Sequence, residues 1–547
     1  MDLVLVGLPG TGKTAVGRRM ARRHGATFFD IDEIVEAAAG RPIPTIFAEE
    51  GEAGFRARER AAVASLGPAD TSPRLARVIA TGGGTPIDPR NRWALYQGRR
   101  VAWLDGPPGI LASRLRHSAV VRPLVAGRDA LAAISALAEA RERFYAPALH
   151  VNGVARVQTI VETLERHLAD EGEAGTSLLR ARTPIGTLEI GDGIAGASVS
   201  RALAALDARR AIVVSEPKAW AVAGKRLAAG LARDGLSVDV LLLPRGEAAK
   251  TLRVVERAAR RLAEMRAERR DPIVAVGGGA LGDAAGFLAA TWLRGVPLVH
   301  VPTTLAAQVD SSIGGKTAVD LPEGKNLVGA FHQPAAIVAD VGLLRTLPRR
   351  QLRAALGEAV KMGVLGDERL LELLESDGRG IARRASEAFA GVAVAEVVER
   401  CAWAKVDVVV ADEREHGASG RITLNLGHSL AHAIEQSMAY AGILHGEAVA
   451  YGLRAAARIG ADLGVTPSDR AARIEALLDA LELAAAPLPL DVERVVAAMR
   501  VDKKVQDGRL RWVLPTGAGV TVRSDVPADL VRAAAAGVLA GRGRATS

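Results

Sequence analysis

The 547-residue chain contains a single cysteine, Cys401, and only 3% of its residues are aromatic. One cysteine excludes a disulfide framework and a thiolate cluster, so a metal ion would need histidine and carboxylate ligands. With so few aromatic residues, the core must be aliphatic. No apolar run approaches the roughly 18 residues that span a bilayer, and the apolar start Met1–Gly7 lacks the basic flank of a signal peptide. The composition predicts a soluble, cytoplasmic protein with no membrane partner.

Basic residues only slightly outnumber acidic ones, with 71 Lys and Arg against 62 Asp and Glu, for a formal net charge of +9. Such a surplus attracts anionic substrates or nucleic acid, or simply reflects an arginine-rich surface. No basic run carries interleaved aromatic residues, so we expect no nucleic-acid partner. The chain is 49% hydrophobic and 24% charged, which is typical of globular proteins. At about 150 residues per domain, its length predicts three to four domains.

Short apolar runs alternate with amphipathic stretches through much of the chain, which indicates βαβ units and parallel sheets. The runs are Leu3–Val6, Arg77–Ala80, Arg100–Leu104, Ala211–Val214, Val238–Leu243, Ile273–Val276, Leu298–Val301 and Ala336–Val338. Glycine, acidic and small polar residues gather near 169–184, as in a linker, and the pattern is mostly helical from about Leu347. We therefore predict an α/β domain at 1–168, a linker at 169–183, a Rossmann-like α/β domain at 184–346 and a mostly α-helical domain at 347–547.

The first segment contains a candidate phosphate loop. Gly7-Leu-Pro-Gly-Thr-Gly-Lys-Thr14 fits the pattern G-x-x-x-x-G-K-[ST], follows an apolar run and opens a predicted helix at Lys13–Arg23. The backbone N–H groups that would wrap a phosphate include those of Gly10, Thr11 and Gly12. Lys13 would reach the outer phosphates of ATP, and the Thr14 hydroxyl would ligate Mg²⁺. The alternative is a glycine-rich turn without a ligand.

Groups that could bind a phosphoryl acceptor follow. Asp30 and Asp32 end a predicted strand, so their carboxylates should lie at the sheet edge that carries the phosphate loop. There Asp32 would orient an acceptor hydroxyl and Asp30 would hold Mg²⁺ through water; the alternative is a helix cap. Gly82-Gly83-Gly84 allows close backbone approach to a small ligand. Arg56 and Arg141 are candidate carboxylate clamps, because a guanidinium matches a carboxylate, although each could equally be a surface arginine.

Residues 1 to about 168 resemble shikimate kinase. The matching features are the phosphate loop, Asp30-Ile-Asp32, Gly51-Glu-Ala-Gly-Phe-Arg56, Thr81-Gly-Gly-Gly84, Arg122-Pro-Leu and Arg141 four residues before Tyr145. The resemblance implies ATP- and Mg²⁺-dependent phosphorylation of the shikimate 3-hydroxyl, with Asp32 as the base. It also implies that shikimate is held by Asp32, Arg56, Gly83 and Arg141, and that Arg122 is a lid arginine that closes on ATP.

The second segment contains a candidate dinucleotide-binding turn. Gly277-Gly-Gly-Ala-Leu-Gly282 fits G-x-G-x-x-G, follows the run Ile273–Val276 and precedes a helix expected from Asp283. No obvious acidic residue follows about 20 residues later at a second strand end, where an ordinary Rossmann domain has one. Glu247, in Pro244-Arg-Gly-Glu-Ala-Ala-Lys250, is an alternative source of that acid.

Histidines and glutamates gather in the helical part. His428 and His432 are four residues apart and share a helix face, and His445 follows in Leu444-His-Gly-Glu447. Upstream, Glu358 and Lys361 share a face of another predicted helix. Histidines with a carboxylate suit Zn²⁺ or a similar divalent ion; the alternative is that some of them are capping or core residues. Spacing alone does not decide whether His432 or His445 completes the site, or which glutamate joins it; Glu435 lies on the same face as the histidine pair.

Residues from about 183 to 540 resemble 3-dehydroquinate synthase. The matching strings are Pro244-x-Gly-Glu247-x-x-Lys250, Gly277-Gly-Gly-x-x-Gly-Asp283, Arg294-Gly, Val301-Pro-Thr303-Thr304, Asp310-Ser-Ser-Ile-Gly-Gly-Lys316, Gly324-Lys325-Asn326, Gly357-Glu358-Ala-Val-Lys361, Asp412-Glu-Arg-Glu415, Asn425-Leu-Gly-His428-x-x-x-His432-Ala-x-Glu435, Leu444-His445-Gly-Glu447 and Asp502-Lys503-Lys504.

The resemblance implies a role for each of these positions. The metal ligands would be Glu358, His428 and His445. The NAD contacts would be Glu247, Lys250, Gly279, Ala280, Leu281, Gly282, Asp283, Thr303, Thr304, Lys316, Lys325 and Thr346. The substrate-binding and catalytic groups would be Asp310, Lys316, Asn326, Lys361, Lys405, Arg421, Asn425, His432 and one of Lys503 and Lys504.

This chain departs from the family pattern in two places. The family has an aspartate that binds the adenosine ribose where this chain reads Ser215-Glu216-Pro217, so Glu216 would bind the ribose instead. The stretch from Glu415 to Arg421 is two residues longer than usual, which puts the position of Arg421 in question.

Together the resemblances imply a bifunctional enzyme of aromatic amino acid biosynthesis, a phosphotransferase joined to a carbon–oxygen lyase. The second unit would cyclise 3-deoxy-D-arabino-heptulosonate 7-phosphate to 3-dehydroquinate with Zn²⁺ or Co²⁺. NAD would take a hydride, phosphate would leave, and the hydride would return before ring closure, without net redox change. The rivals are a related sugar-phosphate cyclase, a metal-dependent polyol dehydrogenase, and a nucleotide-sensing role for the first segment. The sequence is compatible with a homo-oligomer but does not fix the oligomeric state.

Overall fold

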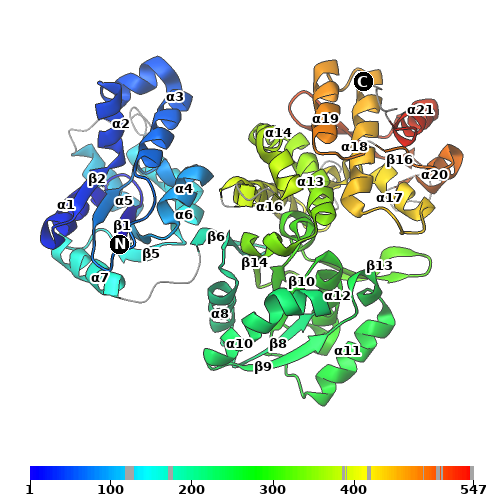
Figure 1. The fold of residues 1–547 in the computed structure, drawn as a ribbon, viewed down its shortest axis with the longest axis horizontal. Coiled ribbons are helices and arrows are strands. Elements are labelled where there is room, and N and C mark those ends of the chain that lie inside the picture. The colour runs from blue at the N-terminus through cyan, green and yellow to red at the C-terminus, as the bar shows by residue number, and fades with distance from the viewer. Residues whose placement is uncertain are drawn as a thin grey trace. The chain divides into compact units, whose positions relative to one another are not determined.

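The computed structural model describes residues 1–117, 129–169, 176–384, 388–389, 391–415, 420–484, 486–499, 505–506 and 509–541. Two compact units make up the chain (Figure 1). Unit 1 comprises Met1–Arg182 and Leu188–Ala197, and unit 2 comprises Thr183–Thr187 and Ser198–Ser547. None of the helices in these described ranges has the length and apolar character needed to span a membrane.

Unit 1 is built on a five-stranded sheet in the order β2-β3-β1-β4-β5, and every pairing between neighbours is parallel. The strands are β1 (Asp2–Val6), β2 (Thr27–Asp30), β3 (Arg77–Ala80), β4 (Arg100–Asp105) and β5 (Leu149–Asn152). Alternate residues of β1 join two separate apolar clusters, with Val4 and Val6 in one and Leu3 and Leu5 in the other. Both faces of the sheet are therefore covered, as expected for a parallel sheet.

Helices cover this sheet and connect its strands. They are α1 (Lys13–His24), α2 (Ile31–Ala39), α3 (Ile43–Ser65), α4 (Pro89–Tyr96), α5 (Pro108–Arg116), α6 (Ala130–Tyr145) and α7 (Val157–Ala169), with the short 3-10 turn η1 (Thr85–Ile87). Because β3 lies between β1 and β2, the loops that follow these three strands are neighbours at one edge of the sheet. These loops begin with Gly7, Ile31 and Thr81, which brings the candidate phosphate loop, the aspartates and the glycine triplet together.

Unit 2 is built on five neighbouring strands in the order β14-β11-β10-β8-β9. They are β8 (Arg210–Ser215), β9 (Ser237–Leu242), β10 (Ile273–Gly277), β11 (Leu298–Pro302) and β14 (Ala336–Asp340), whereas β6 (Thr176–Thr183) and β7 (Gly186–Asp192) lie mostly in unit 1. The pairings from β14 to β9 are parallel, which confirms the predicted α/β class. Part of the stretch that we expected to be a linker forms strand β6. The burial of Leu178 and Leu179 explains why this part is ordered as a strand.

The elements around this sheet place the candidate cofactor residues. They are α8 (Ala195–Ala205), α9 (Pro217–Ala219), η2 (Trp220–Gly224), α10 (Lys225–Arg233), η3 (Gly246–Ala249), α11 (Leu252–Glu264), α12 (Gly279–Thr291), η4 (Trp292–Arg294), η5 (Ala307–Ser311), the hairpin β12 (Lys316–Leu321) and β13 (Gly324–Phe331), and η6 (Val341–Thr346). The expected helix start at Asp283 is wrong, since α12 begins at Gly279. Leu281 is buried in the core, which draws the first helical turn back over the glycines.

The remainder of unit 2 is mostly helical, as predicted. Its elements are α13 (Arg349–Val364), α14 (Glu368–Arg383), α16 (Ala393–Ala411), η7 (Arg421–Asn425), α17 (His428–Ser437), α18 (His445–Asp462), α19 (Ser468–Ala480), α20 (Val492–Met499), the short hairpins β15 (Val505–Gln506) with β16 (Arg509–Leu510) and β17 (Trp512–Pro515) with β18 (Val520–Arg523), and α21 (Ala528–Leu539).

Glycines let three of these helices touch through their backbones. A Cβ on Gly446 of α18 would lie 2.0 Å from the Ala354 carbonyl oxygen of α13, and a Cβ on Gly452 of α18 would lie 1.8 Å from the carbonyl oxygen of Gly427 before α17. Real Cβ atoms do not approach oxygen so closely, so only glycine fits at either position. This contact brings Glu358 on α13, His428 on α17 and His445 on α18 near one another.

We expect Gly446→Ala to destabilise unit 2 by about 1–3 kcal/mol, because the added methyl group forces α13 and α18 apart. Calorimetric unfolding of the full chain should show a lower midpoint for the transition of unit 2. Gly230→Ala on α10 is the matched control: no atom lies within 4 Å of its Cβ position, so stability should stay level or rise by up to about 1 kcal/mol. An unchanged midpoint for Gly446→Ala would refute the close contact.

Candidate active sites

In the candidate phosphate loop of unit 1, the lysine side chain donates hydrogen bonds to carbonyl oxygens of the same loop. Gly12 has φ 87°, a left-handed conformation that favours glycine, and it caps α1. The Lys13 ammonium donates hydrogen bonds to the carbonyl oxygens of Gly7 (2.8 Å) and Leu8 (3.0 Å). The Thr14 hydroxyl donates to Asp30 Oδ2 at 2.7 Å, so a hydroxyl and a carboxylate suited to Mg²⁺ are adjacent. Asp30 also caps α2, since its Oδ1 accepts from the Asp32 N–H.

The predicted acceptor-binding residues of unit 1 converge on the glycine triplet. A Cβ on Gly82 would lie 2.6 Å from Asp32 Oδ1, one on Gly83 would lie 3.4 Å from an Arg141 guanidinium nitrogen, and one on Gly84 would lie 2.6 Å from an Arg56 guanidinium nitrogen. These side chains come from α2, α6 and α3. The triplet therefore faces one carboxylate and two guanidinium groups next to the phosphate loop. Arg122 lies outside the described residues.

Two further residues support this arrangement. The carboxylate of Glu59 is buried and accepts hydrogen bonds from Arg56 (2.9 Å) and the Thr85 hydroxyl (2.7 Å). The Tyr145 hydroxyl donates to the Gly83 carbonyl oxygen, and burial raises the pKa of Tyr145 to about 12, so it remains a donor. Sequence reasoning missed Glu59, although its position three residues after Arg56 on a helix was a usable signal.

A group of candidate metal ligands lies where α13, α17 and α18 meet. One ligand atom each from Glu358, His428 and His445 lies within 4.8 Å of the others. The Nε2 atoms of His428 and His445 lie 3.5 and 3.2 Å from Glu358 Oε1. Their Nδ1 atoms lie 3.0 Å from the Leu426 carbonyl oxygen and from Glu435 Oε2. Acceptors at Nδ1 favour the tautomer that leaves Nε2 free to bind a metal.

The chemistry of this group fits a divalent cation. Neither oxygen of the buried Glu358 carboxylate accepts a well-oriented hydrogen bond, although the Lys361 ammonium lies 2.7 Å from Oε2. Burial would raise the pKa of Glu358, but Lys361 and the histidines hold it well below its usual range. The His432 ring centroid lies 5.6 Å from that of His428 and 6.0 Å from that of His445. His432 therefore lies next to both histidines, but it is not one of the three residues whose ligand atoms lie within 4.8 Å of one another.

Buried charges continue from this group toward the sheet. Lys361 lies 3.7 Å from Asp310 Oδ1, and the Lys405 ammonium lies 2.7 Å from the same oxygen. Burial would raise the pKa of Asp310, but the two lysines hold it below its usual range. Burial would lower the pKa of Lys361, but the carboxylates of Asp310 and Glu358 raise it above its usual value. The carboxylates and Lys361 therefore stabilise one another's charged forms.

Three more predicted residues lie beside this charged row. Lys316 lies 2.5 Å from Glu415 Oε2, and the Asn425 amide donates to Glu415 Oε1 at 3.0 Å. The buried Arg421 guanidinium donates to the Gly314 carbonyl oxygen at 2.9 Å. The longer stretch before Arg421 therefore still places this residue against the segment that joins Asp310 to Lys316. Lys503 and Lys504 lie outside the described residues.

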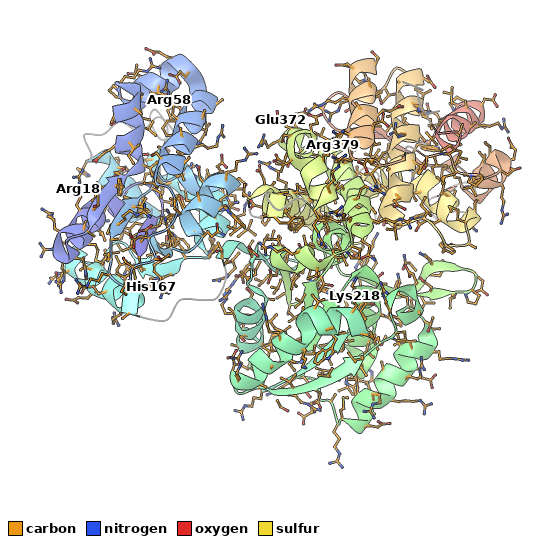
Figure 2. The ribbon with its side chains drawn as sticks, viewed as in Figure 1. Arg18, Arg58, His167, Lys218, Glu372 and Arg379 are labelled. Atoms are coloured by element: carbon orange, nitrogen blue, oxygen red, sulfur yellow. The ribbon has the colours of Figure 1, made fainter. Side chains whose placement is uncertain are left out.

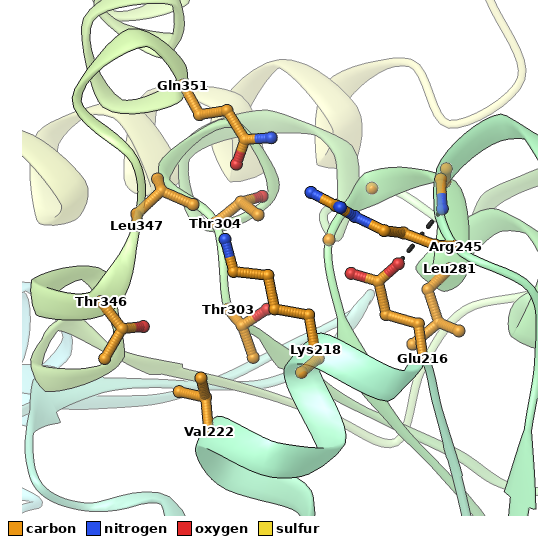
Figure 3. A pocket seen from close by; sticks show the side chains of 15 residues that line it. Glu216, Lys218, Val222, Arg245, Leu281, Thr303, Thr304, Thr346, Leu347 and Gln351 are labelled. Carbon is orange, nitrogen blue, oxygen red and sulfur yellow. Dashed lines mark hydrogen bonds between the residues drawn. The ribbon is translucent and has the colours of Figure 1, made fainter.

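A cavity of about 180 Å³ lies at the carboxyl ends of β8, β10 and β11 (Figure 3). The predicted cofactor residues among its lining are Gly279, Ala280, Leu281, Thr303, Thr304 and Thr346. Glu216 also lines it, whereas Glu247, the alternative acid, does not. Sequence reasoning missed Lys218, Arg245 and Gln351, which reach this cavity from other elements.

Four of the other predicted cofactor residues form a charged cluster near the start of α12: Glu247, Lys250, Asp283 and Lys325. The Lys250 ammonium lies 2.7 Å from Asp283 Oδ2 and also donates to Asn326, and Lys325 lies 3.3 Å from Glu247. Burial raises the pKa of Asp283 to about 6, and the charge of Lys250 opposes that rise. Gly282 is part of the first turn of α12, and a Cβ there would contact the buried His300.

Comparison with known proteins adds an independent line of evidence. The shikimate kinase family model matches residues 9–168, and the N-terminal and C-terminal 3-dehydroquinate synthase models match residues 240–354 and 355–505. A 3-dehydroquinate synthase of Synechococcus sp. is 43% identical over 323 residues, 59% of this chain and 86% of the relative.

Two solved structures are also similar. The 2-epi-5-epi-valiolone synthase of Streptomyces hygroscopicus subsp. jinggangensis, with NAD⁺ and Zn²⁺ bound, is 28% identical with a TM-score of 0.57, covering 61% of this chain and 92% of that one. A 2-deoxy-scyllo-inosose synthase complexed with carbaglucose-6-phosphate, NAD⁺ and Co²⁺ is 27% identical with a TM-score of 0.55, covering 67% of this chain and 99% of that one.

If Glu358, His428 and His445 bind one divalent ion, replacing any of them by alanine should sharply lower metal content, because two remaining ligands hold an ion poorly against a chelator. His432→Ala is the matched control and should keep its metal. The measurement is elemental analysis of the purified full chain after dialysis against chelator. A full metal content in His445→Ala with depletion in His432→Ala would instead identify the histidine pair of α17 as the site.

Proposed function

The chain belongs to the 3-dehydroquinate synthase family and carries a shikimate kinase ahead of it, and on this basis we propose which residues perform each reaction. It is a bifunctional enzyme of the shikimate pathway, with kinase and lyase activities. One observation supports the residue assignment. In each unit, a candidate site for an anion or a metal ion lies next to a cluster of charged side chains. The 43% identity to a 3-dehydroquinate synthase, against 28% and 27% to the two related cyclases, favours 3-dehydroquinate as the product.

In unit 1 we assign phosphoryl transfer from ATP to shikimate. Arg56 and Arg141 would hold the shikimate carboxylate, since two guanidinium groups face the same glycine triplet. Asp32 would accept the proton of the attacking hydroxyl, and Gly83 would bring backbone close to the ring. When ATP binds, the Lys13 ammonium would exchange its hydrogen bonds to the loop carbonyl oxygens for contacts with the outer phosphates. Thr14 and Asp30 would together hold Mg²⁺.

In unit 2 we assign the cyclisation of 3-deoxy-D-arabino-heptulosonate 7-phosphate. The donor set of Glu358, His428 and His445 fits Zn²⁺ or Co²⁺, and the cavity at Gly279 is lined by residues that would contact the dinucleotide. When bound, the metal supplies Lewis-acid polarisation of an oxygen and NAD supplies a reversible hydride acceptor.

The residues of the chain would bind and orient the substrate around these groups. Lys361, which lies between Glu358 and Asp310, would donate a hydrogen bond to a substrate oxygen. Lys316, Lys405 and Arg421 supply positive charge for the phosphate and carboxylate. Asn425, which donates to Glu415, and His432 would supply further hydrogen-bonding groups, and Asn326, which accepts from Lys250, would contact the substrate.

The remaining assignments extend the same proposal. We place the domain boundaries at 1–168, 184–346 and 347–547. We place both reactions in the cytoplasm, which suits a chain with a single, buried cysteine. The two reactions are not consecutive in the pathway, so we propose no transfer of intermediates between the units.

Lys13→Ala should lower kinase turnover by about 10²–10³-fold, because a contact that strengthens in the transition state is lost, and should leave phosphate release by unit 2 unchanged. Lys361→Met should do the reverse. ADP formation with shikimate and phosphate release from the heptulosonate phosphate are measured separately on the full chain. Arg19→Ala, an exposed cation on α1, is the control and should affect neither. An equal loss of both activities in a folded Lys13 variant would contradict independent sites.

A further inference from the structure

Three neighbouring strands of unit 2 deliver polar groups to one end of the dinucleotide cavity. In the sheet order, β8 lies between β9 and β10. Glu216 follows β8, Arg245 and Gly246 follow β9, and Gly278 and Gly279 follow β10, and all five residues line the cavity. Because the strands are parallel, their carboxyl ends lie at the same edge. The glycine turn marks the pyrophosphate end, so the neighbouring strand end of β8 marks the adenosine ribose.

The acid at this ribose end is held in place and is accompanied by two cations. Glu216 Oε2 accepts a hydrogen bond from the Gly246 N–H at 3.1 Å, which ties the loop after β9 to the end of β8. Figure 3 shows Arg245 and Lys218 extending over the cavity near this bond. Among the described residues, neither cationic side chain has a hydrogen-bond or ion-pair partner. The charged lining is therefore one carboxylate against two cations.

This combination bears directly on which dinucleotide the cavity accepts. A carboxylate at the end of the second strand accepts a hydrogen bond from the ribose 2′-hydroxyl of NAD, whereas a nearby arginine accommodates the 2′-phosphate of NADP. A carboxylate alone would repel a 2′-phosphate, which carries about −1.5 to −2 charges. Here Arg245 immediately precedes Gly246, whose N–H donates a hydrogen bond to the Glu216 carboxylate. A guanidinium also presents two parallel donors to a phosphate, which a lysine does not.

We propose that this cavity binds NADP as well as NAD, with Glu216 contacting the 2′-hydroxyl of NAD and Arg245 receiving the 2′-phosphate of NADP. Lys218 adds a positive charge that serves both dinucleotides. Arg245 and Glu216 thus determine cofactor specificity at the 2′ position. The inference rests on the dinucleotide site assigned above and adds a second ligand to it.

The test is calorimetric titration of the full chain, freed of nucleotide, with NAD and with NADP. For the unmodified chain we expect the two dissociation constants to lie within about tenfold of each other, because two cations offset the one carboxylate. Arg245→Ala should weaken NADP at least tenfold and leave NAD within about twofold, since only the 2′-phosphate loses its partner. Glu216→Gln should shift the ratio in favour of NADP. Arg253→Ala, an exposed arginine of α11 outside the cavity lining, is the control and should change neither constant.

The outcomes separate this inference from the function on which it rests. If NAD binds and NADP does not bind at concentrations that saturate the site with NAD, the inference fails and the NAD site stands. If neither dinucleotide binds, the assignment of the cavity itself fails. If Arg245→Ala weakens both equally, Arg245 contacts a group common to both, and the inference is overturned. As a check on position, adenosine 2′,5′-bisphosphate should compete better than 5′-AMP in the unmodified chain, and this advantage should vanish in Arg245→Ala.

Discussion

The carboxylate of Glu358 is 2% exposed, and an isolated charge at that depth is costly unless neighbouring groups compensate it. Lys361, three residues along α13, supplies one compensating charge, and the Nε2 atoms of His428 and His445 face the other side of the carboxylate. Lys361 in turn contacts Asp310, and Asp310 contacts Lys405. The candidate metal group and the charged row that would receive substrate are therefore one electrostatic system. A change in any member alters the field at all the others.

Both units place their candidate chemistry by the same geometric device. Parallel strands end at one edge, and loops that are distant in the sequence meet there when their strands are neighbours. In unit 1, the order β2-β3-β1 joins the aspartates, the glycine triplet and the phosphate loop. In unit 2, the order β10-β8-β9 joins the glycine turn, Glu216 and Arg245. The helical part of unit 2 uses direct helix contact instead, and its candidate metal ligands come from three helices.

The sequence predicted features that are local or repeated along the chain. The apolar runs located the main strands of both sheets, and the phosphate-loop pattern correctly placed the start of α1. Helix periodicity put His428 and His432 on one face, but it carried no information on the packing of α18, which brings His445 to Glu358 instead. Lys218 and Arg245 escaped notice because nothing local marks two surface cations as neighbours of one cavity. The start of α12 was misplaced because the burial of Leu281, a long-range effect, decided it.

The glycine contacts between α13, α17 and α18 have a consequence for the ion itself. Helices that meet through backbone atoms cannot slide or spread without breaking many contacts at once, so the spacing of their ligands is fixed by the fold rather than by the ion. A ligand triangle of fixed dimensions selects by ionic radius and bond length. Zinc and cobalt, which bind nitrogen and carboxylate oxygen at about 2.0–2.2 Å, suit two imidazoles and one carboxylate, whereas calcium at about 2.3–2.6 Å requires a wider shell of six to eight oxygen atoms. If these three side chains bind the ion, the rigid packing of the helix backbones would select the metal by its size.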